Sequence, residues 1–170
     1  MERLEILQWP DPRLALKAQP VADSEFGEPM RALAEAMREA MGRAGGIGLA
    51  ATQVGVPKRV FLMMRSGQVE TVCNPRVEAA EGSAGIEEGC LSLPGARATL
   101  ERAGKIRASW RRADGEAVEA ELAALEAVCF QHELDHLDGV LMLDRAKPAR
   151  RQRMQGQVEA ARRAMAKGRR

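Results

Sequence analysis

The chain has 170 residues, of which 45% are hydrophobic and 29% charged, with a net charge of +2; this balance is typical of one globular domain and excludes disorder along the whole length. No apolar run approaches the roughly 18 residues of a membrane span, the first residues lack a secretory signal, and the three cysteines show no paired spacing. We therefore expect a soluble cytoplasmic monomer with no membrane partner, and 3% aromatic residues are too few for a platform that stacks single-stranded nucleic acid.

The first half of the chain predicts one helix and two strands. Two prolines in residues 9–13 indicate an extended arm or turn. Helical spacing of four apolar residues predicts an amphipathic helix over residues 29–42: Met30, Leu33, Met37 and Met41. A glycine-rich loop follows at residues 45–55. Short apolar runs then predict strands at residues 59–64 and 69–73, the second closed by an Asn-Pro pair.

The second half predicts further strands and two helices. A strand is expected at residues 87–93, stopped by a Pro-Gly pair, and residues 105–110 and 116–121 flank an Asp-Gly turn typical of a β-hairpin. Helical spacing predicts a central helix over residues 122–137 and a C-terminal helix from Pro148, weakened by a glycine at position 156. We expect a small single α+β domain, with mostly antiparallel strands around the central helix and with N-terminal and C-terminal helices.

The central helix carries the strongest local signal, the run His132-Glu133-Leu134-Asp135-His136. Histidines four residues apart share one helix face, so both rings can bind one metal ion, and Glu133 beside the first ligand can reach metal-bound water. The chain has only two histidines, and both lie here. The alternative is a pair of structural histidines on a surface helix, which we consider the weaker interpretation. The run predicts a metal-binding helix.

A catalytic site needs a third protein ligand and one open position. The third ligand could be a carboxylate or any of the three cysteines. Cys129 shares the helix face of His132, but it lies seven residues before His136, and seven helical residues rise about 10 Å. We favour Cys90, which follows Gly89, a residue that lets another backbone come close. One thiolate and two imidazoles suit zinc or ferrous iron.

The glycine-rich loop formally fits a relaxed dinucleotide-binding fingerprint through Gly46, Gly48 and Ala51, but it follows a helix where that fingerprint requires a strand. We interpret its glycines as allowing a substrate backbone to lie close. Gln53, just beyond the loop, could donate a hydrogen bond to an oxyanion. Taken alone, Gln53 is better explained as a structural hydrogen-bonding residue.

Three stretches together resemble the peptide deformylase family in its bacterial type I form. They are Gly46 to Gln53, Glu88 to Ser92 and Gln131 to His136. The resemblance covers about residues 4–147, so we divide the chain into a catalytic deformylase domain at residues 1–147 and a basic C-terminal helix or tail at residues 148–170. It implies a hydrolase that removes the formyl group from the N-terminal formyl-methionine of newly made polypeptides and releases formate.

The resemblance also implies roles for individual residues. It implies three metal ligands: Cys90, His132 and His136. Glu133 would activate the metal-bound water, and the Gln53 side chain and the Leu91 backbone N–H would stabilise the oxyanion. The ion would be Fe²⁺ in the cell, with Zn²⁺ or Ni²⁺ possible in purified protein. Three alternatives stay open: a zinc endopeptidase, a structural metal site on a ribosome- or RNA-binding module, and a paralogue with another acyl substrate.

A substrate pocket for the methionine side chain is expected beside the metal. Its floor would come from the central helix and its walls from flanking loops: Leu125, Val128, Cys129, Ile47 and Ile86. Ordinary core packing is the alternative for Val128 and Cys129. We expect Gly48 and Gly89 to face the peptide backbone, which would pair as an added strand.

The charge is distributed unevenly along the chain. Residues 145–170 carry ten Lys or Arg and one acid, a net charge of +9, which leaves −7 for the remainder. We expect this segment to bind the phosphate-rich surface of the ribosome, as the resemblance also implies. The alternative is a solvated helix face.

Overall fold

The computed structural model describes residues 3–167. A five-stranded antiparallel sheet has the order β1-β2-β3-β6-β7, and a separate hairpin pairs β4 with β5. The strands are β1 Gly48–Ala50, β2 Val60–Arg65, β3 Gln68–Glu81, β4 Glu87–Cys90, β5 Leu93–Thr99, β6 Lys105–Arg111 and β7 Ala117–Ala123. The α-helices are α1 Glu28–Ala44, α2 Ala124–Leu137, α3 Met142–Arg145 and α4 Pro148–Lys167, and short 3-10 helices span Pro12–Ala15, Asp23–Glu25 and Ala51–Val54. The expected α+β fold is confirmed.

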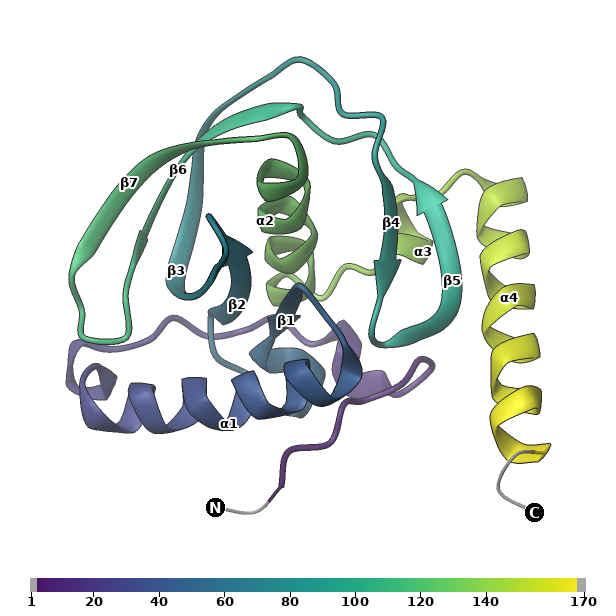
Figure 1. The fold of residues 1–170 in the computed structure, drawn as a ribbon, viewed down its shortest axis with the longest axis horizontal. Coiled ribbons are helices and arrows are strands. Elements are labelled where there is room, and N and C mark those ends of the chain that lie inside the picture. The colour runs from purple at the N-terminus through teal and green to yellow at the C-terminus, as the bar shows by residue number, and fades with distance from the viewer. Residues whose placement is uncertain (1–2, 168–170) are drawn as a thin grey trace.

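Helix α2 is the centre of the molecule, with the large sheet on one side and the β4–β5 hairpin on the other (Figure 1). Its Phe130 is fully buried and packs edge-on against Phe61 of β2, with ring centroids 5.2 Å apart, and against Trp110 of β6 at 5.8 Å. Nine of the 14 residues of α2 are buried, both histidines among them. The packing fixes the helix that carries both histidines.

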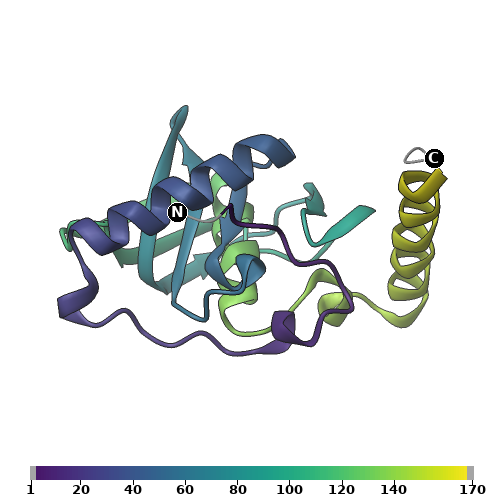
Figure 2. The same cartoon turned by 90° about the horizontal axis from the view of Figure 1, so that it is seen from below.

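The two outer helices cover different parts of the molecule. The methionine stripe of α1 packs Met37 and Met41 against Leu49 and Leu62 of the sheet, as its spacing predicts. Figures 1 and 2 place α4 on the outer side of β5, away from α2. There Met154 and Val158 are fully buried in a cluster with residues of β5, whereas Met165 is exposed. The C-terminal helix is thus anchored through Met154 and Val158.

The predicted end of the strand at residues 69–73 is wrong, because β3 continues through Asn74 and Pro75 to Glu81. A shift of register lies between Cys73 and Arg76, and Asn74 has a positive φ of 50°. This bulge accommodates the missing proline N–H while the strand changes partner from β2 to β6. The Asn74 side chain is held by both backbone groups of Val21.

Three other predicted boundaries also differ. The strand expected over residues 87–93 is two strands joined by a tight turn at Leu91 and Ser92, and β5 runs through the Pro-Gly pair. Leu122 belongs to β7, where it pairs with Ile106, so α2 begins two residues later than predicted. The helix predicted from Pro148 is present as α4 and continues through Gly156, whereas α3 is an element that the periodicity did not predict.

Candidate metal centre

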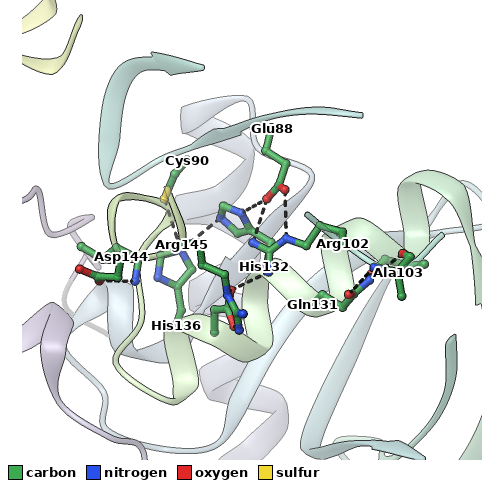
Figure 3. Close-up of polar contacts among 12 residues, drawn as sticks. Glu88, Cys90, Arg102, Ala103, Gln131, His132, His136, Asp144 and Arg145 are labelled. Carbon is green, nitrogen blue, oxygen red and sulfur yellow. Dashed lines mark hydrogen bonds and ion pairs between the residues drawn. The ribbon is translucent and has the colours of Figure 1, made fainter. Parts of the chain in front are cut away.

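Cys90, His132 and His136 lie together where the end of β4 meets the face of α2 (Figure 3). One ligand atom from each residue lies within 4.8 Å of the others. The Cys90 Sγ is 3.3 Å from the His136 Nε2, which is 3.2 Å from the His132 Nε2. Both histidines are buried. The structure therefore brings together the three residues expected as ligands.

The other two cysteines lie in environments that oppose metal binding. Burial raises the pKa of Cys73 to about 12, and this thiol belongs to the core under α1. Burial also raises the pKa of Cys129 well above its usual value, and the Cys129 Sγ lies 3.8 Å from the Ile47 carbonyl oxygen. Because a metal binds the thiolate, thiols held protonated are poor ligands. The preference for Cys90 is consistent with both observations.

Glu133 gives an independent indication that this site suits a metal ion. Its side chain is 3% exposed, and its Oε2 has no hydrogen-bond partner among the described residues. Burial raises the pKa of Glu133 to about 7. A buried carboxylate oxygen without a partner is costly in free energy. Together with a donor set of one thiolate and two imidazoles, this orphaned oxygen fits a divalent metal ion with an open coordination position.

The ring of His132 is oriented by a buried carboxylate. Its Nδ1 lies 2.9 Å from Glu88 Oε2, and Glu88 in turn accepts two 3.0 Å bonds from Arg102. Burial alone would raise the pKa of Glu88, but bonds from His132 and Arg102 keep it below its ordinary value. An ionised Glu88 accepts a hydrogen bond from the Nδ1–H of His132, which leaves Nε2 without a proton and free to bind a metal.

Arg102 belongs to a larger set of polar contacts around α2. Its Nη1 donates to Asp135 Oδ2 at 2.6 Å, and Asp135 also binds Arg145. Gln131 clamps the loop before β6, since its side chain both donates to and accepts from the backbone of Ala103 at 3.0 Å (Figure 3). These contacts hold Arg102 against the helix that carries the histidines.

Gln53 points at the same centre from the opposite side. It is 1% exposed, and its Oε1 accepts from the Ala50 N–H at 2.8 Å. The Nε2 therefore faces Cys90 Sγ at 3.6 Å and Ser92 Oγ at 3.1 Å. Leu91 lies in the turn between these two residues. A fixed amide donor of this kind can stabilise negative charge that develops beside the ligands.

The expected glycines are close to side chains of the site. A Cβ on Gly48 would collide with Glu133 Oε1 and lie 2.9 Å from Cys129 Sγ, and one on Gly89 would lie 2.5 Å from the Arg97 guanidinium. The space that these glycines leave is taken by side chains of this chain. The absence of a Cβ at Gly48 allows Glu133 to approach β1.

The residues expected to line a substrate pocket differ in exposure. Val128 and Cys129 are buried, Ile86 is half-buried, and Leu125 and Ile47 are 51% and 46% exposed. The assignment of all five to substrate remains a prediction.

Sequence reasoning gave no role to five residues that shape the centre: Glu88, Ser92, Arg102, Asp135 and Arg145. Ser92 lies inside a quoted motif, so its proximity to Gln53 could have been suspected. Arg102 and Arg145 lie outside every motif and reach α2 only through the fold. Within the part of the chain that the structure describes, no helix is both long and apolar enough to cross a membrane.

Comparisons with known proteins agree with this geometry. The family model described as polypeptide deformylase matches residues 3–152. The peptide deformylase of Alkalilimnicola ehrlichii is 44% identical over 163 residues, which cover 94% of this chain and 90% of that protein. The crystal structure of a peptide deformylase from Legionella pneumophila matches with a TM-score of 0.89 at 35% identity, covering 96% of this chain and 97% of that one. A Met-Ala-Ser-bound deformylase from Acinetobacter baumannii matches with a TM-score of 0.80 at 32% identity, covering 84% and 98%.

Proposed function

The chain belongs to the peptide deformylase family, whose members are hydrolases that remove N-terminal formyl groups. From that premise we propose its substrate, its metal ion and the roles of its catalytic residues. The substrate is the N-terminal formyl-methionine of newly made polypeptides, and formate is released. The Met-Ala-Ser peptide bound by the relative from Acinetobacter baumannii supports a short methionine-led peptide as the ligand. The observation that carries the proposal is the cluster of Cys90, His132 and His136. Glu133, the residue next to His132, has a buried carboxylate oxygen with no hydrogen-bond partner in the described structure.

Three residues would hold one divalent ion: Cys90, His132 and His136. Such an ion lowers the pKa of a coordinated water toward about 7 and polarises a carbonyl oxygen. We take the ion to be Fe²⁺ in the cell, with Zn²⁺ or Ni²⁺ in purified protein. The thiolate and the two imidazoles are donors that suit all three ions.

Glu133 moves the proton. Its unpartnered Oε2 accepts a proton from the attacking water as the water oxygen bonds to the formyl carbon. When the bond between the formyl carbon and the nitrogen breaks, Glu133 returns that proton to the leaving amine. The immediate products are formic acid and a peptide with a free amine; formic acid then gives its proton to the amine, which leaves formate and a protonated amino terminus, so atoms and charges balance.

Gln53 and Leu91 act on the tetrahedral oxyanion. The Gln53 Nε2 is already aimed at the ligands by its bonds to Ala50 and Ser92, so it does not need to reorganise during the reaction. The backbone N–H of Leu91 follows the ligand Cys90 directly. Preorganised donors of this kind stabilise charge that appears only in the transition state.

Two free strand edges favour an extended substrate. Strand β1 pairs only with β2, and β4 pairs only with β5, so each has one open edge in the described structure. A peptide can add to such an edge through main-chain hydrogen bonds. Gly48 and Gly89 lie on these two strands and would face the peptide, while Leu125, Val128, Cys129, Ile47 and Ile86 would surround the methionine side chain.

The basic C-terminal helix is proposed to bind the ribosome surface. In the described part of α4 the anchored residues Met154 and Val158 are buried, whereas Arg153, Arg163 and Lys167 are exposed. Their neutralisation to Gln, which leaves the buried anchor intact, should weaken co-sedimentation with ribosomes at low salt. Unchanged co-sedimentation would exclude this surface. We also propose that the enzyme acts in the cytoplasm as a monomer, where nascent chains emerge.

The activity is tested with formyl-Met-Ala-Ser under anaerobic conditions, with the metal content measured on the same sample. We expect formate release in proportion to bound metal. A peptide with a blocked amino terminus is the comparison substrate, and cleavage of its internal peptide bonds in place of deformylation would identify an endopeptidase instead. A metal-loaded enzyme that leaves the formyl peptide intact would contradict the proposed substrate.

A further inference from the structure

Arg145 connects the C-terminal segment, here residues 145–167, to the face of α2 that carries the histidines. It lies at the end of α3, three residues before α4 begins. Its guanidinium forms a bidentate ion pair with Asp135, with Nε 2.7 Å from Oδ2 and Nη2 2.5 Å from Oδ1. Two-point pairs of arginine with a carboxylate fix orientation as well as distance. Asp135 is the residue next to the ligand His136.

From Asp135 a continuous set of ion pairs leads to the other histidine. The same Asp135 Oδ2 accepts from Arg102 at 2.6 Å, Arg102 holds both oxygens of Glu88 at 3.0 Å, and Glu88 Oε2 is 2.9 Å from His132 Nδ1. Figure 3 shows Glu88 joined both to the His132 ring and to Arg102. Each contact restricts the next side chain toward the ligand.

Charge and burial make Arg145 necessary to this arrangement. The side chains of Arg102 and Glu88 are 3% and 4% exposed, and Asp135 is 10% exposed. With Arg145 present, two arginines neutralise two carboxylates. Arg102 already contacts both Glu88 and Asp135; without Arg145 it would have to neutralise the two carboxylates alone, and the Asp135 Oδ1 would lose its arginine. A buried carboxylate that loses one of its partners is destabilised, and it attracts the remaining cation, here Arg102, more strongly.

We propose that Arg145 is a positioning residue for the metal centre: by fixing Asp135 it lets Arg102 hold Glu88, and Glu88 then sets the ring of the ligand His132. The inference rests on the proposed function in one respect, that Cys90, His132 and His136 hold a divalent ion. It adds that the start of the C-terminal segment helps to build the site. A carboxylate that accepts a hydrogen bond from the N–H of a ligand histidine both orients the ring and raises its basicity as a metal ligand.

The test measures metal release from the full-length zinc-loaded protein into an excess of chromogenic chelator. Removal of a group that orients a ligand costs about 10–100-fold in metal affinity, and because Arg145 acts through other side chains we expect release from Arg145→Ala to be about tenfold faster than from the wild type. The cobalt-loaded variant should also show shifted visible absorption bands, which report the ligand geometry directly.

Arg151→Ala is the matched control. Arg151 lies on the same segment, has a side chain 45% exposed against 47% for Arg145, and pairs with Asp144 instead of Asp135. It should release zinc at the wild-type rate, which separates the Asp135 contact from a mere loss of charge. Arg145→Lys keeps a cation beside Asp135 and should fall between wild type and Arg145→Ala.

The inference is overturned if Arg145→Ala releases zinc at the wild-type rate, if Arg151→Ala releases it as fast as Arg145→Ala, or if Arg145→Lys gives no recovery. These outcomes are distinct from a failure of the proposed metal site. In that case the wild-type protein itself would take up no stoichiometric zinc and would show no cobalt–thiolate absorption.

Discussion

Gly48→Ala tests how closely Glu133 is fitted to its place. The new Cβ would collide with Glu133 Oε1 and lie 2.9 Å from both Glu133 Cδ and Cys129 Sγ, whereas ordinary contacts of a Cβ begin near 3.4 Å. Both side chains are buried, so at least half an ångström of displacement must come from the carboxylate or the backbone of β1. Overpacking of this kind costs about 1–3 kcal/mol.

The expected result has two parts. A loss of 1–3 kcal/mol lowers the melting temperature of a chain of this size by roughly 2–12 °C. Because a misplacement of about 1 Å can cost about 100-fold in rate, we expect kcat on formyl-Met-Ala-Ser to fall by about 10–100-fold while the metal content stays at the wild-type level.

Gly42→Ala is the control for this substitution. Gly42 lies within α1, and a Cβ there has no atom within 4 Å. Replacement of glycine by alanine inside a helix stabilises by roughly 0.5–1 kcal/mol, so the melting temperature should rise slightly with no change in kcat. The reasoning is refuted if Gly48→Ala keeps both wild-type stability and wild-type kcat.

Three further outcomes follow from the site. Cys90→Ala should purify without metal, whereas Cys129→Ala should retain it; metal loss from Cys129→Ala alone, measured by elemental analysis, would overturn the ligand assignment. Gln53→Ala should lower kcat by about 10²–10³-fold as one oxyanion donor is lost, and Ser92→Ala should lower it less, since it only loosens the Gln53 amide; equal rates for Ser92→Ala and wild type would argue against that support. Met154→Ala should cost about 2–5 kcal/mol in urea unfolding because the side chain is fully buried under β5, and a smaller loss would show that α4 is not anchored there.

The elements that sequence patterns predicted well depend on local spacing. The methionine stripe of α1 and the histidine pair of α2 are both determined by which residues share one helix face, and the structure keeps both faces. The Asp-Gly turn likewise specifies the β6–β7 hairpin, where Gly115 has a positive φ of 91°. These features need no knowledge of distant residues.

The features that escaped prediction depend on partners far along the chain. The Asn74–Pro75 pair closes a strand in isolation, but here it forms a bulge because β6 arrives as a new partner. Arg102 contacts Asp135 across 33 residues and Arg145 reaches the same carboxylate from α3. No periodicity marks such residues, because single arginines on a loop or short helix are usually solvated.

We propose above all that Glu133 transfers the proton in the reaction and is not itself a ligand of the metal. The measurement that tests it most directly is the turnover of formyl-Met-Ala-Ser by metal-loaded Glu133→Gln, with the bound metal quantified in the same preparation. An amide has nearly the same shape but cannot accept the proton, so we predict full metal occupancy and a loss of about 10²–10⁴-fold in kcat. Glu119→Gln, an exposed position on β7, should match the wild type. Near wild-type turnover by Glu133→Gln at full occupancy would contradict the account.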